Sequence, residues 1–130
     1  MNNGIIPTSW TPALQALLRV ITGLLFVEHG TMKLFAFPVA QMEGPLPPLL
    51  MVAAIIEVVA GLLIAVGFLT RWAAFIAAGE MAVAYFMGHV SAGGFWPGVN
   101  KGGEAILYTF IFLFFAAAGA GAYSVDSSRK

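Results

Sequence analysis

Four ionisable residues fall inside long apolar stretches of this sequence: Arg19, Glu28, Glu57 and Glu80. If those stretches cross a lipid bilayer, each charge near its centre costs about 2.5 to 3.5 kcal/mol, so the four side chains should face inward and find partners. Such residues ordinarily mark a binding site or a proton pathway, and the alternative is a buried polar contact that fixes helix register. Three of these residues have carboxyl groups and only Arg19 has a cationic group, so acidic groups are in excess. We therefore expect at least one of these carboxyl groups to bind a proton, a cation or a ligand.

A second set of polar residues gathers at one end of these stretches, because chain direction alternates from each stretch to the next. The set consists of Glu28, His29, Lys33, Glu57, Trp96, Asn100, Glu104 and Tyr108. His29 and Lys33 are four residues apart and share a helix face, as do Glu104 and Tyr108. We expect ligand binding or proton exchange at this end, although Lys33 and Glu104 also suit compensation of helix dipoles.

Three further residues, Arg19, Arg71 and Glu80, are predicted to have structural polar roles deeper in the membrane or at its other face. Arg19 and Arg71 lie on the side of the chain termini, and Glu80 lies between the two ends. Their expected task is to satisfy buried partners and to hold helices together.

The residue types admit a quinone as ligand, although they establish no cofactor. A quinone head group requires aromatic walls and one or two hydrogen-bond donors at the edge of the apolar layer, which Trp96, His29 and Tyr108 supply. Haem held by His29 and His89 is disfavoured, because the two residues differ in depth by about one and a half helical turns. No metal site is predicted, since no Glu-x-x-His pair occurs. Hydrolase and nucleotide motifs are also lacking.

Four apolar segments must position these side chains, at approximately 13–35, 49–69, 72–90 and 104–122. Each contains about 19 to 23 residues, enough at 1.5 Å per residue to cross a hydrocarbon core of roughly 30 Å. Because no water satisfies backbone groups at that depth, the segments should be helices. The sequence therefore predicts an all-α, membrane-embedded four-helix bundle, a single domain over residues 1–130 with both termini on the same side.

The composition indicates the same class of protein. The chain has 130 residues, of which 60% are hydrophobic and 9% charged, whereas ordinary globular domains have about 25% charged residues. A chain this short cannot bury so much apolar surface by itself, so the lipid bilayer is its first expected partner. Six cationic residues balance six anionic ones, which excludes a basic surface for nucleic acid. The absence of cysteine excludes disulfides and thiol chemistry.

Positive charges predict the orientation. The terminal side carries Arg19, Arg71, Arg129 and Lys130, and the other side carries Lys33 and Lys101. By the positive-inside rule, this excess favours cytoplasmic termini. The N-terminus lacks the basic region and cleavage site of a secretory signal, so we expect the first segment to be retained. Gly and Ala faces suit helix contacts and also leave a homo-oligomer open.

A resemblance to a known family rests on motifs that are spread along nearly the whole chain. They are H-G-x-x-K-L-F from His29, E-x-x-x-G-L-L from Glu57, T-R from Thr70 and N-x-G-G-E from Asn100. In this combination the sequence resembles the DoxX family. By position, the family pattern singles out Arg19, His29, Gly30, Lys33, Glu57, Thr70, Arg71, Asn100 and Glu104. Glu80 and His89 do not match that pattern.

The resemblance implies a bacterial inner-membrane protein of four helices. Relatives are described as small membrane subunits of quinone-linked oxidoreductases such as thiosulfate:quinone oxidoreductase. Some relatives assemble with soluble redox enzymes in oxidative-stress defence. The leading hypothesis is therefore an accessory subunit of such a redox system, with a soluble redox enzyme as partner and a polar site in the outer half of the bundle.

In that role His29 and Tyr108 hydrogen-bond the head group, Glu57 or Glu104 exchanges protons, and Lys33 holds a carboxylate ionised. The first alternative is a small-molecule or proton transporter. The second is a purely structural membrane anchor for a soluble partner. Polar groups concentrated on one side favour a site, since a transporter needs them through both halves of the membrane.

Overall fold

The computed structural model describes residues 4–129, and over that range the chain forms helices and no β-strand. The long helices are α1 (Thr11–Leu34), α2 (Pro48–Val66), α3 (Thr70–Ala84) and α6 (Gly103–Ala118), with the short helix η1 (Thr8–Trp10) before α1. A π-helical segment, η2 (Tyr85–Val90), and α4 (Ser91–Gly93) continue α3, and the short helices α5 (Pro97–Asn100) and α7 (Val125–Ser128) flank α6. The predicted all-α class is confirmed.

Three helical stretches among the described residues are long and apolar enough to cross a membrane: Thr8–Leu34, Pro48–Val66 and Thr70–Gly93. They correspond to the first three predicted segments. The fourth prediction, 104–122, was too long, because α6 ends at Ala118. Gly119 and Gly121 follow with φ angles of 81° and 74°, a conformation that glycine adopts readily and that interrupts a helix. The 16 residues of α6 give a length of about 24 Å.

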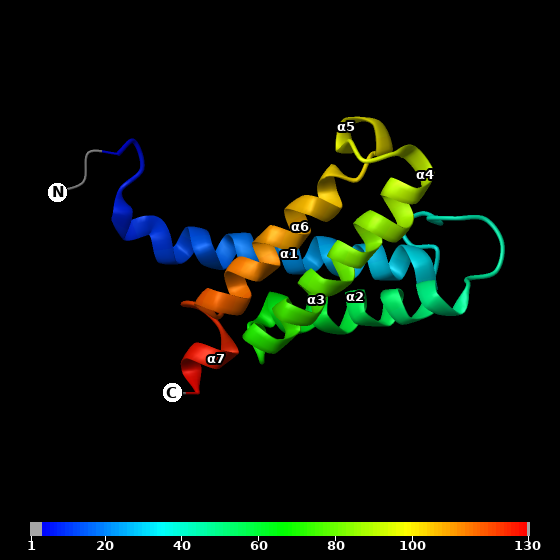
Figure 1. The fold of residues 1–130 in the computed structure, drawn as a ribbon. Coiled ribbons are helices and arrows are strands. Elements are labelled where there is room, and N and C mark those ends of the chain that lie inside the picture. The colour runs from blue at the N-terminus through cyan, green and yellow to red at the C-terminus, as the bar shows by residue number, and fades with distance from the viewer. Residues whose placement is uncertain (1–3, 130) are drawn as a thin grey trace.

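The helices α1 and α2 approach each other through glycine. A Cβ atom on Gly23 would lie 2.8 Å from the backbone nitrogen of Ala65 and 2.8 Å from the carbonyl oxygen of Gly61, and one on Gly61 would lie 2.8 Å from the carbonyl oxygen of Gly23. Backbones that come this close gain van der Waals contact, which drives helix association in lipid. The two helices therefore form a tightly packed antiparallel pair (Figure 1).

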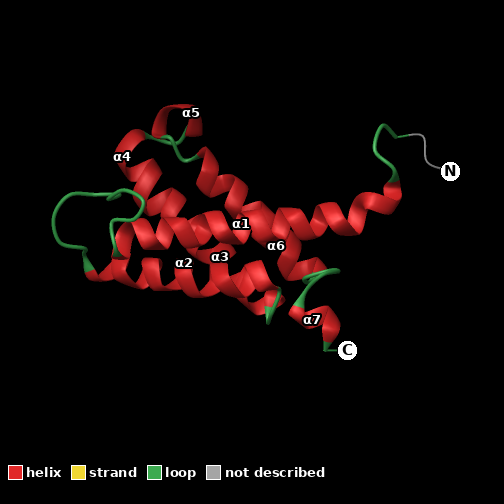
Figure 2. Cartoon of the chain, turned by 180° about the vertical axis from the view of Figure 1, so that it is seen from behind, coloured by secondary structure: helices red, strands yellow, loops and turns green. Residues whose placement is uncertain are grey.

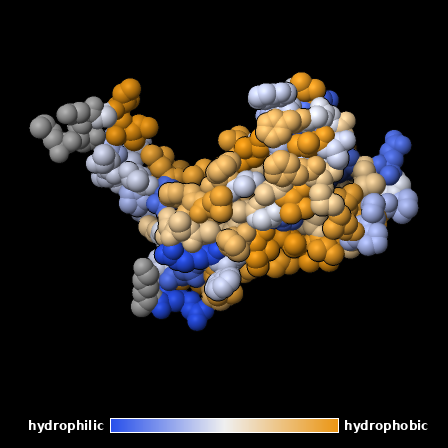
Figure 3. Space-filling view, viewed as in Figure 1, coloured by the Kyte–Doolittle hydropathy of each residue, from blue (hydrophilic) through white to orange (hydrophobic). Residues whose placement is uncertain are grey.

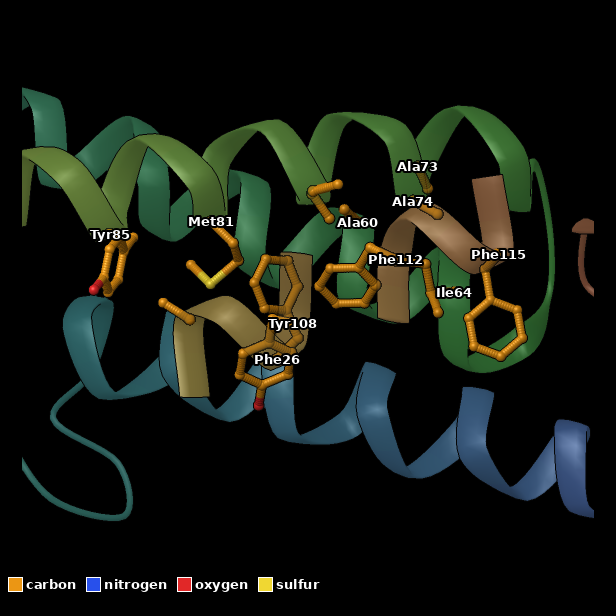
Figure 4. Close-up of a cluster of buried hydrophobic side chains, with 13 residues drawn as sticks. Phe26, Ala60, Ile64, Ala73, Ala74, Met81, Tyr85, Tyr108, Phe112 and Phe115 are labelled. Carbon is orange, nitrogen blue, oxygen red and sulfur yellow. The ribbon is translucent and has the colours of Figure 1, made fainter. Parts of the chain in front are cut away.

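The helices α3 and α6 form a second pair, and aromatic side chains join it to the first. Figure 4 shows the buried cluster between them, in which the rings of Phe26 and Phe112 lie 4.8 Å apart and those of Phe26 and Tyr108 lie 5.4 Å apart. Phe26, Ile64, Phe112 and Phe115 are fully buried. This apolar core runs along the helices from Phe115 as far as Tyr85 (Figure 4).

The segment after α6 is held by two arginines. The Arg19 guanidinium, only 1% exposed, donates hydrogen bonds to the carbonyl oxygens of Ala120, Ala122 and Tyr123, at 2.6, 3.1 and 2.7 Å. Arg71 donates to the carbonyls of Ala117 and Ala118. The carbonyls at the end of α6 lack partners within the helix, so Arg71 supplies missing donors there, and Arg19 bonds the segment that follows.

The helix α7 is held against the start of α3 by Asp126. Its carboxylate accepts hydrogen bonds from the backbone N–H groups of Leu69 and Thr70, both at 3.0 Å. Burial alone would raise the pKa of Asp126, but these backbone hydrogen bonds outweigh it and lower the pKa below its usual value. Asp126 thus caps α3 from a distant part of the sequence.

Apolar and hydrophilic side chains occupy different regions of the surface. Apolar side chains cover the middle of the molecule, and hydrophilic residues gather at its two ends (Figure 3). The start of α1 and α7 lie at one end, and the loops 35–47 and 94–102 lie at the opposite end (Figures 1 and 2). This pattern and the three apolar helices indicate contact with the lipid bilayer. Lys130, which entered the orientation prediction, lies outside the described residues.

Candidate functional site

A cavity of about 740 Å³ lies between the α1–α2 pair and the α3–α6 pair, in the half of the molecule away from α7. The two pairs diverge toward this end in Figure 1. The polar part of the cavity lining is formed by His29, Lys33, Gln41, Glu57, Glu80, His89, Lys101, Glu104 and Tyr108. Residues far apart in the sequence therefore meet at one site, and five of them are predicted site residues.

The innermost polar residues of the cavity are Lys33, Glu57 and Glu80. The Lys33 Nζ atom lies 2.7 Å from Glu57 Oε1, and the side chains are 10% and 1% exposed. The carboxyl group of Glu80 neighbours that of Glu57 in the cavity lining. Glu80 Oε1 is buried and has no hydrogen-bond partner among the described residues. One lysine thus faces two neighbouring carboxyl groups, each from a different helix.

His29 and Glu104 form a second polar contact, which is more exposed than the first. The Nδ1 atom of His29 lies 2.9 Å from the carbonyl oxygen of Leu25, which can only accept, so Nδ1 carries a hydrogen. Its Nε2 atom lies 2.7 Å from Glu104 Oε1. A proton must lie between these two atoms, either on an imidazolium or on a neutral carboxyl group. The side chain of Glu104 is 62% exposed, so this contact can exchange protons with water.

Tyr108 lies beside His29 on the same side of the cavity. Its ring meets the imidazole edge to face, with ring centres 5.5 Å apart, and the residue is buried. Within residues 4–129, the structure gives the Tyr108 hydroxyl no hydrogen-bond partner, although it lines the cavity. The hydroxyl is therefore free to bond a ligand there.

The walls of the cavity are apolar and reach the surface that faces lipid. They include Leu49 and Val52 from α2, and Phe75, Ile76, Val83 and Met87 from α3 and η2. All six are exposed large hydrophobic residues. Because they belong to both α2 and α3, the cavity is open to the side, between these helices.

Three predicted site residues do not line the cavity. Glu28 is exposed and lies about 100° around α1 from His29. Trp96 is 71% exposed. Asn100 is buried, but its amide donates to the Gly94 carbonyl at 2.8 Å and accepts from the Gly102 N–H at 2.7 Å. Its role in the structure is therefore to shape the loop that precedes α6.

The residue roles also differ from the prediction in the deep set. Arg19 and Arg71 do lie away from the cavity: Arg71 bonds the end of α6, and Arg19 bonds the chain after it. Glu80, predicted as structural, lies in the cavity against Glu57. His89, Lys101 and Gln41 line it as well. The sequence places Glu80 near the middle of the third apolar segment, which indicates its depth in the membrane. Depth alone does not indicate whether the side chain faces the cavity.

Comparison with known proteins agrees with this architecture. The family model described as DoxX matches residues 14–90. An uncharacterised protein of Haemophilus influenzae is 42% identical over 123 residues, which cover 91% of this chain and 92% of that relative. No solved structure matches. The apolar helices of this chain are long enough to span a bilayer, as expected of a membrane protein. Because the family model covers more than half of the chain, the protein belongs to the DoxX family.

Proposed function

We propose that this protein is an accessory subunit of a quinone-linked or oxidative-stress redox system in a bacterial inner membrane, and that a quinone binds in the cavity. The observation that carries the proposal is the form of the cavity, whose apolar walls open to lipid and whose inner lining is polar. A lipophilic molecule with a hydrogen-bonding head group matches both parts. Its tail would occupy the apolar walls, and its head would meet the polar lining.

The polar residues suit the oxygen atoms of a quinone. The Tyr108 hydroxyl stands at one side of the cavity as a hydrogen-bond donor, and the His29–Glu104 contact lies beside it. The Lys33 Nζ atom bonds Glu57 Oε1 in the buried part of the lining. The His29–Glu104 contact connects the cavity with water. Protons taken up or released by the head group on reduction or oxidation therefore have an exchange point beside it.

Two features favour a binding site over a transport pathway. The half of the molecule nearest α7 is filled by Phe26, Ile64, Phe112 and Phe115, all fully buried. Arg19, the cation that a pathway would require there, already bonds three backbone carbonyls. Polar groups therefore do not continue from the cavity to the terminal side. A cavity of about 740 Å³ also favours a ligand over a purely structural anchor.

In the proposed arrangement α6 is the fourth membrane crossing, and both termini are cytoplasmic. The helix α6 packs beside α3. Its 16 residues are extended toward the terminal side by the segment 119–123 that Arg19 holds. The wide apolar surface leaves room for a homo-oligomer. The soluble redox enzyme expected from the family would then meet the protein at the membrane surface.

Binding of a short-chain quinone, decylubiquinone, to the purified protein in detergent tests the proposal. We expect a thermal shift that saturates with quinone concentration. We also expect Tyr108→Phe to weaken binding by about five-fold, because one hydrogen bond is lost. Tyr123→Phe is the matched control, since Tyr123 is exposed and lies outside the cavity.

The absence of any quinone-dependent shift in the unaltered protein, with no quinone in its extracted lipids, would contradict the proposal. So would equal effects of the two tyrosine substitutions, because binding would then not involve the cavity.

A further inference from the structure

Three successive helices each place one ionisable residue at the innermost part of the cavity: Lys33 from α1, Glu57 from α2 and Glu80 from α3. One ammonium group therefore faces two carboxyl groups. If both were ionised, this group would carry an uncompensated negative charge where water is largely excluded, as the 1% exposure of Glu57 shows. Such a charge is strongly unfavourable, and binding one proton removes it.

The proximity of the carboxyl groups leads to the same result. The carboxyl groups of Glu57 and Glu80 neighbour each other in the cavity lining. Two carboxylates have only acceptor oxygens and repel each other, whereas a carboxyl group and a carboxylate share a hydrogen bond. This arrangement is therefore favourable only when the pair holds one proton.

The position of Lys33 indicates which residue carries that proton. Its ammonium group is bonded to Glu57 Oε1 at 2.7 Å, which stabilises the ionised form of Glu57. No lysine or arginine is bonded to Glu80 among the described residues, and its Oε1 atom is buried without a partner. The proton is therefore more stable on Glu80.

The other charged or titratable groups that line the cavity do not supply a second cation to the pair. They are His29, His89, Lys101, Glu104 and Tyr108. His29 is bonded to Glu104, and the Nδ1 atom of His89 lies 3.1 Å from the carbonyl oxygen of Asn100. Lys101 is exposed in the loop before α6. Lys33 therefore remains the one cation that is bonded to the Glu57–Glu80 pair among the described residues.

We propose that Glu57 and Glu80 hold one proton between them at neutral pH, carried by Glu80, and that Glu80 donates it as a hydrogen bond to an oxygen acceptor of the lipophilic ligand. The ligand class follows from this chemistry: a neutral molecule with a carbonyl oxygen on an apolar body. The second part of this inference rests on the proposed function, whereas the protonated state of Glu80 follows from the contacts alone.

Infrared spectroscopy of the purified protein without quinone tests the protonated state, because the carbonyl stretch of a carboxylic acid is separate from carboxylate bands. We expect such a band at neutral pH and its loss in Glu80→Gln. Glu104→Gln and Glu28→Gln should retain it. In the unaltered protein the band should disappear only at alkaline pH. This titration needs no variant, so the inference can be tested even if Glu80→Gln does not fold.

A spectrum in which Glu80→Gln retains the full band, or in which the unaltered protein has no band at neutral pH, would overturn the inference. Quinone binding to the unaltered protein in the same preparation would then show that the proposed function survives. Conversely, if the band is present but no quinone binds, the proposed function is refuted, whereas the inference that Glu57 and Glu80 share a proton is supported.

The donor role is tested by two substitutions that differ only in hydrogen bonding. Glu80→Gln keeps an N–H donor and should bind decylubiquinone within about three-fold of the unaltered protein. Glu80→Met has a similar size but no donor, and its affinity should fall by about ten-fold. A purely structural Glu80 would make the affinities of the two variants equal, which would refute the donor role.

Discussion

At the residue scale, the feature that defines this protein is the ion pair between Lys33 and Glu57. Its atoms are 2.7 Å apart, and both side chains are largely removed from solvent. Removal of one partner from a buried pair leaves a charge without compensation, whereas replacement of both partners can be nearly neutral. The pair therefore contributes little net stability, and its main effect is to fix the positions of the Lys33 and Glu57 side chains in the cavity.

A double-mutant cycle on Lys33 and Glu57 measures this effect. Lys33→Met alone should lower the free energy of unfolding by roughly 3 to 5 kcal/mol, because Glu57 loses its cation. The double variant Lys33→Met with Glu57→Gln should recover a large part of the loss. Unfolding in mixed detergent micelles, followed by far-ultraviolet circular dichroism, gives these values.

Lys101→Met is the matched control, because Lys101 is exposed, and its effect should lie within about 0.5 kcal/mol of zero. If the effects of Lys33→Met and Glu57→Gln simply add in the double variant, the two side chains are not coupled.

At the scale of elements, the contact between α1 and α2 sets the position of His29 and Lys33 relative to Glu57. Gly23 and Gly61 allow the two backbones to approach so closely that a Cβ atom on either would lie 2.8 Å from the other's backbone. The α1 side chains can then cross to α2. The small residues in this contact thus act on the site indirectly, through helix distance and rotation.

Gly23→Ala should destabilise the protein by about 1 to 3 kcal/mol, because its methyl group would overlap the backbone of Gly61 and Ala65 and force α1 away from α2. Gly79→Ala is the matched control in α3. A Cβ there meets no atom within 4 Å, and alanine is favoured over glycine within a helix by up to about 1 kcal/mol. Thermal unfolding in detergent compares the two. Equal stability of both variants would refute close helix contact at Gly23.

At the scale of the whole molecule, two helix pairs are packed tightly near α7 and separated near the loops. Arg19, Arg71 and Asp126 hold the chain after α6 against the starts of α1 and α3. Part of the aromatic core lies in the same half. The cavity lies in the opposite half, beside the buried side chains of Met81, Ala105 and Tyr108. The cavity lined by His29, Lys33 and Glu57 therefore lies at the end opposite α7.

Single-cysteine variants test the membrane topology, since the chain has no cysteine of its own. We expect Glu43→Cys and Val99→Cys to react with a membrane-impermeant maleimide in spheroplasts. Ser127→Cys should react only after permeabilisation. All three residues are exposed, so access depends on membrane side alone. Labelling of Val99→Cys and Ser127→Cys from the same side would show that α6 does not cross the membrane.

The sequence by itself determined the helices and the set of residues that could do chemistry. Apolar length, with Pro48 at the start and Gly67 at the end of α2, is a local property, so the positions of three apolar helices could be predicted. The same holds for the polar end of the molecule, because alternating chain direction brings His29 near Glu104. The end of α6 was missed, since the glycines after it lie in an equally apolar stretch.

Only the tertiary structure decided which of these residues meet. Glu28, Glu57 and Glu80 are equivalent in the sequence as carboxyl groups in apolar segments, yet Glu28 is exposed while Glu57 and Glu80 neighbour each other in the cavity lining. The physical reason is helix rotation and crossing. These are set by long-range contacts such as Gly23 with Gly61 and Arg19 with Ala120, which local residue patterns do not encode.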